Sequence, residues 1–169
     1  MSEIRVDAIK TRAGAVPTAN DVGINVTGTI LQVKSVSFGT QQVSTSSSYV
    51  ASTDATLAIT PSSTSSKILT IFSPTVRVYQ NNSNDANMRV ALSADGGSSY
   101  LYQQPIRSYD YGGSGSLIDI PISKTFLHSP ATTSEITYTG YFKLVAGDQI
   151  EFNPDTTDRT TLTLIEVAG

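Results

Sequence analysis

The 169-residue chain has no cysteine, no tryptophan and a single histidine. These absences exclude a disulfide framework, a cysteine nucleophile and a histidine-rich metal site. Charged residues are few, at 15%, and the net charge is −3, so we expect no binding of nucleic acid or of an anionic membrane. Apolar runs are far shorter than the roughly 20 residues that span a bilayer, so we expect no membrane insertion. The charged N-terminus lacks the apolar segment of a secretory signal.

Small hydroxyl residues are abundant instead, with 23 Ser and 22 Thr. They are interleaved with Val, Ile, Leu, Tyr and Phe, and this mixture favours pleated, half-buried strands over disorder. No window of a dozen residues has the apolar spacing of an amphipathic helix. The length fits one domain of ordinary size.

Short alternating segments are separated by turn residues along most of the chain. Pro74 is expected to mark a bulge, kink or edge position, and Asp95-Gly96-Gly97 a hairpin. The pattern predicts an all-β fold, an antiparallel β-sandwich of jelly-roll type. The expected strands lie at residues 24–38, 40–51, 55–60, 67–80, 88–95, 99–111, 117–129, 135–145, 149–153 and 160–169.

The first 27 residues differ from the rest in having little to bury. We interpret residues 1–27 as an extended N-terminal arm and linker, and residues 28–169 as the β-sandwich body. The run Ile4, Arg5, Val6 and Asp7 alternates in polarity, which suits addition as a strand to the sheet edge of a partner. A frayed terminus is the alternative.

Several segments resemble a known group of proteins. The opening SEIRVDAIKTRAGA, GTILQV at 28–33 and ITPSSTSSKIL at 59–69 resemble tail-fibre and minor virion proteins of bacteriophages, especially those of cyanobacteria and marine bacteria. The closing EITYTGYFKLVAGDQIEF and RTTLTLIEVAG resemble the last strands of the C1q/TNF-like jelly roll, in which three subunits pack around an axis.

This resemblance implies a structural protein of the phage virion. Its N-terminal arm is expected to attach to capsid, tail or fibre proteins, and its body to form a homotrimer that contacts the host surface. The chain is short for a complete fibre and has no coiled-coil heptads. A compact knob or a capsid decoration (cement) protein therefore fits as well as a tail fibre.

Catalytic patterns are weak. His128 stands at a strand-to-turn boundary and no G-x-S-x-G surrounds any serine. The carboxylate pairs Asp110/Asp119 and Asp148/Glu151 are the candidates for glycoside hydrolysis, but they look like ordinary surface acids. We expect no enzyme, no catalytic residue and no cofactor; a polysaccharide depolymerase is the less favoured alternative.

Acidic residues also gather near the C-terminus, at Asp148, Glu151, Asp155 and Asp158. Ca²⁺ takes six to eight oxygen ligands, so these side chains are candidate ligands. Their spacing does not match an EF-hand loop, and Gly147 and Pro154 next to them are typical of turns. We therefore expect no metal site.

Tyrosines are concentrated between residues 79 and 111. Tyrosine offers rigid contact area and a hydroxyl group, so such a cluster can bind glycan or protein. The alternative is cross-strand packing. If the cluster binds host glycan, the protein is a carbohydrate-binding receptor-recognition module. The predicted ligand-binding patch comprises Tyr100, Tyr102, Arg107, Tyr109, Asp110 and Tyr111.

The two closing strand segments are apolar on both faces. Tyr141 and Phe142 are adjacent and point to opposite sides, and so do Leu164 and Ile165. A strand that is apolar on both faces is usually covered on both. We therefore predict that Tyr141, Phe142, Leu164 and Ile165 lie at an oligomer interface with closed symmetry. Only the resemblance favours three-fold over two-fold symmetry.

Overall fold

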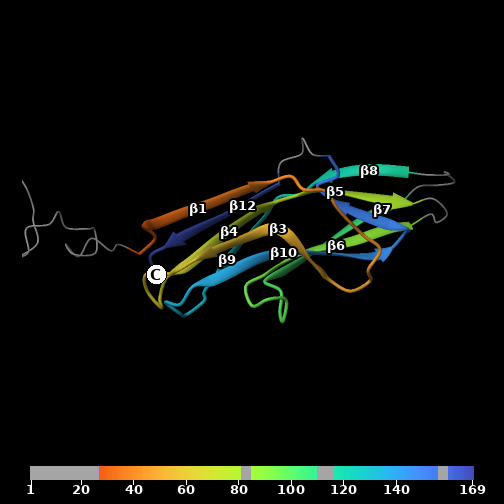
Figure 1. The fold of residues 1–169 in the computed structure, drawn as a ribbon. Helices are drawn as coiled ribbons and strands as arrows, with labels where there is room; N and C mark the ends of the chain where they lie inside the picture. The colour runs from red at the N-terminus through yellow and green to blue at the C-terminus, as the bar shows by residue number, and fades with distance from the viewer. Residues whose placement is uncertain (1–26, 81–84, 110–115, 156–159) are drawn as a thin grey trace, which may run out of the picture.

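The protein is described by a computed structural model that covers residues 27–80, 85–109, 116–155 and 160–169. The predicted all-β antiparallel fold is confirmed for these residues (Figure 1). The predicted arm at residues 1–27 lies outside them except for Thr27. The strands are β1 (Ile30–Phe38), β2 (Gln42–Ser44), β3 (Val50–Ile59), β4 (Lys67–Ser73), β5 (Thr75–Gln80), β6 (Asp85–Ser93), β7 (Tyr102–Tyr109), β8 (Ser116–Pro121), β9 (Lys124–His128), β10 (Ile136–Ala146), β11 (Gln149–Phe152) and β12 (Thr160–Val167).

The strands pair as one long nested hairpin. The first strand pairs with the last, β2 with β11, β3 with β10, and so on inward to β6 with β7. The hairpin is rolled up, so that β4, β5 and β6 also pair with β12, β11 and β10. Every pairing is antiparallel.

Three sheets result, in the orders β1-β12-β4-β9, β2-β11-β5-β8 and β3-β10-β6-β7. In the first two sheets, each strand of one sheet continues along the chain into a strand of the other: β1 into β2, β4 into β5, β8 into β9 and β11 into β12. The continued strands stand in the same order in both sheets. They form one bent layer that faces the third sheet. Merging the continued strands leaves eight, four in each layer, which is the topology of a jelly roll.

Pro74 lies at the bend, between β4 and β5. Proline has no N–H to donate to a sheet ladder, so the predicted interruption of the strand at 67–80 is confirmed. The carbonyl oxygens at the bend are still used. That of Pro74 accepts from the Ile122 N–H at 2.9 Å, and that of Thr75 from the Asn153 N–H at 2.9 Å.

Four phenylalanines fill the core behind the bend. The ring of Phe152 is 5.1 Å from that of Phe142, 6.1 Å from Phe72 and 6.4 Å from Phe38. These residues come from both layers, so the stack joins them. Alternation in the strands explains the arrangement, since β12 and β4 bury every second side chain.

The serine-rich segment departs from the expectation. Instead of one strand over 40–51, the structure has the short β2 followed by a loop at 45–49. The hydroxyl of Ser44 accepts from the Ser46 N–H and that of Ser46 from the Ser48 N–H, at 3.0 and 3.1 Å. Serine side chains that bond the local backbone compete with sheet pairing, which explains the loop.

Candidate functional site

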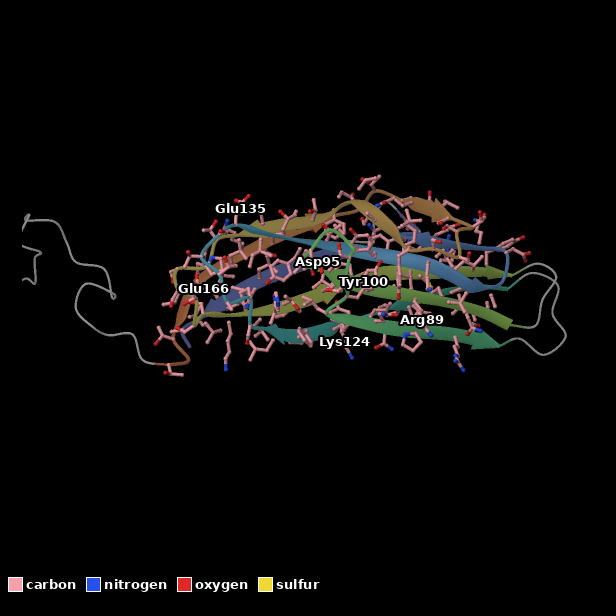
Figure 2. All side chains as sticks on the ribbon, turned by 90° about the horizontal axis from the view of Figure 1, so that it is seen from below. Arg89, Asp95, Tyr100, Lys124, Glu135 and Glu166 are labelled. Carbon is pink, nitrogen blue, oxygen red and sulfur yellow. The ribbon has the colours of Figure 1, made fainter. Side chains whose placement is uncertain are left out.

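The candidate site is the outer face of the β3-β10-β6-β7 sheet, together with the loop at 94–101 that joins β6 to β7. Tyr100 of this loop packs on the sheet between two other tyrosines. Its ring centroid lies 4.3 Å from that of Tyr49 and 5.5 Å from that of Tyr141. Figure 2 shows Tyr100, Asp95 and Arg89 together on this side of the molecule.

The loop is held by its own hydroxyl groups. The Asp95 carboxylate accepts from the hydroxyls of Ser99 and Ser93 and from the Ser99 N–H, at 2.6 to 2.9 Å. These bonds, chiefly those from Ser99, lower the pKa of Asp95 to about 2. Gly97 has a φ of +89°, and a Cβ built on it would stand 2.9 Å from the Tyr141 hydroxyl. The loop therefore lies directly on Tyr141.

The predicted tyrosine patch is only partly assembled. Tyr102 does not share a face with Tyr100, because Tyr100 lies in the loop before β7. The side chain of Tyr102 points between the layers, where its ring centroid lies 6.4 Å from that of Phe126. Burial raises the pKa of Tyr102, and its hydroxyl has no hydrogen-bond partner among the described residues. Arg107 is exposed on the outer face. For Tyr109 only the backbone is described, and Asp110 and Tyr111 lie outside the described residues.

The structure adds residues that the sequence analysis missed. Lys143 of β10 stands directly opposite Arg89 of β6, and its ammonium lies 4.7 Å from the centre of the Tyr49 ring. Gln103 of β7 accepts from the Tyr49 hydroxyl at 3.0 Å and from Arg89 Nη1 at 3.2 Å. Burial raises the pKa of Tyr49, and the charge of Arg89 partly offsets this. No local signal could find this cluster, because it depends on the register of distant strands.

Hollows border the same face beside β7. One groove of about 420 Å³ lies between Gln104–Arg107 of β7 and the β8–β9 junction at Ile120–Ser123. A smaller hollow of about 40 Å³ lies on the other side, where Arg107 meets Arg89 and Val145. Arg107 therefore lines both.

His128 has a structural environment. Its Nδ1 lies 2.7 Å from the hydroxyl of Tyr138, a residue with no exposed surface. Burial lowers the pKa of His128 and raises that of Tyr138. The pair joins the end of β9 to β10, so His128 contacts a buried tyrosine of the opposite layer.

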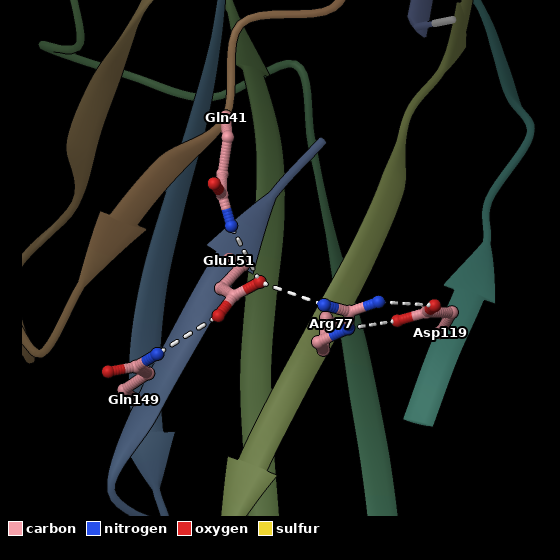
Figure 3. Close-up of polar contacts among 5 residues, drawn as sticks. All are labelled: Gln41, Arg77, Asp119, Gln149 and Glu151. Atoms are coloured by element: carbon pink, nitrogen blue, oxygen red, sulfur yellow. Dashed lines mark hydrogen bonds and ion pairs between the residues drawn. The ribbon is translucent and has the colours of Figure 1, made fainter. Parts of the chain in front are cut away.

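The candidate hydrolytic carboxylates Asp119 and Glu151 share one arginine (Figure 3). Arg77 Nη2 donates to Asp119 at 2.7 Å, and Nη1 donates to Glu151 at 3.3 Å. Gln41 and Gln149 also donate to Glu151, each at 3.0 Å. The hydrogen bond from Arg77 lowers the pKa of Asp119. A general acid for glycoside hydrolysis needs a raised pKa, so the pairing disfavours this role.

The acidic residues that were weighed as calcium ligands do not form a metal site within the described part of the chain. Asp158 lies outside the described residues, and Glu151 is committed to Arg77. Asp148 and Asp155 have polar or electrostatic contacts of their own. Within the described ranges, no group of three or more His, Asp or Glu side chains could hold a metal ion. In the same part of the chain, no helix has the length and apolarity to cross a membrane.

Two of the four predicted interface residues belong to the core of a single chain. Phe142 is 1% exposed and stacks on Phe152, and Leu164 has no exposed surface. The interface role predicted for them is corrected, because the opposite layer of the same chain already covers them. Tyr141 is 9% exposed and lies beneath Tyr100. Only Ile165 faces outward on the bent layer.

Ile165 is part of an apolar row that crosses the outer face of the β1-β12-β4-β9 sheet. The strand register places Val33, Ile165, Leu69 and Leu127 side by side, one from each strand. Val33 is 57% exposed and Leu127 49%. We call these four residues the apolar row.

The turn at 61–66, part of the segment that resembles phage proteins, is fixed by Glu166 of β12. Both the N–H and the hydroxyl of Ser62 donate to Glu166 Oε1 at 2.7 Å, and Gln32 Nε2 donates to Oε2 at 2.5 Å. Burial opposes ionisation of Glu166, but these hydrogen bonds outweigh it and lower the pKa. Gly28 and Ala168 pair at the same end, with the Gly28 N–H donating to the Ala168 carbonyl at 2.8 Å.

Comparisons with known proteins give no family. No family model matches the chain, and no curated protein matches it either. Its fold is similar to that of the VP2 protein of infectious bursal disease virus in a subviral particle, with a TM-score of 0.36, 15% identity, and coverage of 82% of this chain and 33% of that one.

Two further structures of this virus give similar values. For the Gx strain the TM-score is 0.38, with 10% identity and coverage of 98% of this chain and 37% of that one. For the T13 viral particle the TM-score is 0.36, with 8% identity and coverage of 98% and 40%. The chain thus spans well under half of the length of these proteins. At such scores the jelly-roll assignment rests on the strand pairing of the chain itself.

Proposed function

We propose that this chain is a structural protein of a phage virion, a tail-fibre knob or a capsid decoration protein, that assembles as a homotrimer. The apolar row is the observation that carries the assembly role. Val33, Ile165, Leu69 and Leu127 form a continuous stripe across a whole sheet face. Contiguous exposed apolar surface marks interaction sites, and identical copies usually close into cyclic symmetry.

The position of the N-terminal segment supports attachment from one end. Thr27 and Gly28 enter the body beside Ala168, where β1 pairs with β12. Figure 1 shows the start of β1 and the C-terminus at the same end of the elongated body. Residues 1–27, with Ile4, Arg5, Val6 and Asp7 at their head, would dock on another virion protein from this end. The opposite end would project.

The assembly role is tested by light scattering on the full chain after size exclusion. We expect a mass of three 17.9 kDa protomers, and a lower mass for Leu127→Ser. The matched control is Val145→Ser, a side chain with a similar exposed fraction of 52% on the outer face of the opposite layer. A monomeric wild-type protein, or equal loss of mass in the control, would contradict the assignment.

The virion role is tested by imaging particles labelled with antibody against this chain. We expect label at a fixed place on the particle, and loss of label when residues 1–27 are deleted, while circular dichroism of the shortened protein stays β-rich. Absence of the chain from purified particles would refute the virion role.

Recognition of host glycan is a second candidate function. It is favoured by the half-exposed rings of Tyr49 and Tyr100 beside Arg89 and Gln103. A glycan array distinguishes the two roles, since specific binding that is lost in Tyr100→Ala supports recognition. If no glycan on the array binds, assembly remains the only proposed role.

A further inference from the structure

Three cations stand in a row across the outer face of the β3-β10-β6-β7 sheet. Lys143 is directly opposite Arg89, and Arg107 is opposite Asn87, two residues along β6 from Arg89. We call Lys143, Arg89 and Arg107 the basic row. Like charges directly opposite each other on neighbouring strands destabilise a sheet. The arrangement is unexpected in a chain whose net charge is −3.

The described contacts of the row differ from those of Arg77. Arg77 on the bent layer is held by both Asp119 and Glu151. By contrast, Arg89 donates to the neutral side chain of Gln103, and Lys143 lies over the Tyr49 ring. The described contacts of Arg89 and Lys143 are thus with uncharged groups. The carboxylate of the covering loop, Asp95, is engaged by Ser93 and Ser99.

The surroundings of the row suit a polyhydroxylated ligand. Tyr49 and Gln103 hold Arg89 in place and present a hydroxyl and an amide at the surface. Arg107 lines the groove of about 420 Å³ beside β7. Aromatic rings, hydroxyls and amides next to a charged group are the features that fix a ligand's orientation in a binding site.

We propose that the basic row binds an acidic polysaccharide, one that carries carboxylate or sulfate groups along its chain. Neighbouring strands lie about 4.8 Å apart, so the three cations can meet successive anionic groups of an extended polymer. β10 and β6 each have a bonded strand on both sides. At Lys143 and Arg89 no backbone edge is therefore free for a peptide strand, and the side chains make the contact. Arg107 lies on β7, which ends the sheet. The proposal rests on the second candidate function, glycan recognition by this face, and stands independently of the assembly role.

Chain-wide charge argues against nucleic acid as the partner. Binding to nucleic acid depends on neutralising many phosphates, whereas this chain is acidic and offers three cations on the face. A polysaccharide with widely spaced charges needs fewer cations for binding, and its hydroxyl groups can form hydrogen bonds with Tyr49 and Gln103.

The test is titration calorimetry on the full chain with heparin as the sulfated probe, polygalacturonate as the carboxylated probe and dextran as the neutral one. We expect binding to at least one acidic probe that weakens as salt is raised, and no binding to dextran. Arg89→Gln combined with Lys143→Gln should weaken the affinity by roughly tenfold or more, because charged hydrogen bonds are lost. The matched control is Lys67→Gln with Lys124→Gln on the other layer.

Several results would overturn the proposal. One is the absence of binding to both acidic probes at low salt. Another is an equal loss of affinity in the Lys67/Lys124 control, which would indicate nonspecific attraction. Equal or tighter binding of a DNA duplex would refute the polysaccharide class. Circular dichroism and the thermal midpoint of each variant establish that a loss of binding is not a loss of fold. The virion role is tested by antibody labelling of particles, so a lack of polysaccharide binding would not contradict it.

Discussion

At the scale of single residues, Glu166 shows how one carboxylate can secure a turn. It has no exposed surface and accepts from Ser62 and Gln32. A buried carboxylate is costly unless such donors satisfy it. Because Ser62 belongs to the turn at 61–66 and Gln32 to β1, the charge ties three separate parts of the chain together.

Replacement of Glu166 by glutamine should destabilise the protein by about 1–3 kcal/mol at neutral pH, since a charged acceptor of several hydrogen bonds is lost. The pKa of Glu166 is lowered in the folded state. Its contribution is therefore present above the pKa of the unfolded state and is lost as pH falls through the folded pKa. Urea unfolding from pH 7 to pH 3 should show a smaller loss of stability in the variant. Glu135→Gln, at an exposed position, is the control; an equal effect there would contradict the role.

Gly97 is a second residue with a specific requirement. Gly97→Ala places a Cβ 2.9 Å from the Tyr141 hydroxyl, on a backbone with a φ of +89°. We therefore expect the free energy of unfolding to fall by about 2 kcal/mol or more. Gly96→Ala has a similar φ of +72° but open space around it. Its free energy of unfolding should fall only by the cost of the strained backbone, about 1 kcal/mol. Equal thermal midpoints for the two variants would show that Tyr141 does not press on the loop.

At the scale of the element, β12 separates core from surface within two consecutive residues. Leu164 is fully buried, whereas Ile165 belongs to the apolar row. A strand sends successive side chains to opposite faces, so the two residues report on different properties of the protein.

Leu164→Ala should therefore lower the free energy of unfolding by about 2–5 kcal/mol in whatever oligomer forms. Ile165→Ser should leave the stability of the protomer nearly unchanged and reduce the oligomeric mass. Chemical denaturation and light scattering measure the two effects. A change of mass in Leu164→Ala without loss of stability would contradict the division.

Element-level features were largely predictable from sequence. Alternation located β12 and β4, and Pro74 marked the bend, because both signals are local. The loop at 45–49 was missed, since serine side chains replaced sheet partners there. The basic row was missed for another reason. Arg89 and Lys143 are neighbours only through the register of β6 and β10, and no local pattern encodes that register.

At the scale of the whole molecule, nested pairing places most strand partners far apart along the chain. β1 meets β12, and β2 meets β11. Closing such long loops slows folding. We expect refolding after dilution from urea to take milliseconds to seconds, followed by stopped-flow tyrosine fluorescence. Refolding within microseconds would show that local contacts dominate instead.

The same topology has a practical consequence for labelling and display. The Gly28 N–H is hydrogen-bonded to the Ala168 carbonyl. A fluorescent protein fused after Gly169 would therefore interfere sterically with a partner that binds the amino-terminal segment. β10 runs away from the C-terminus toward the other end of the body (Figure 1). An epitope inserted in the turn that follows β10, before β11 begins at Gln149, would instead be presented at that end. Reporters for microscopy are best engineered there.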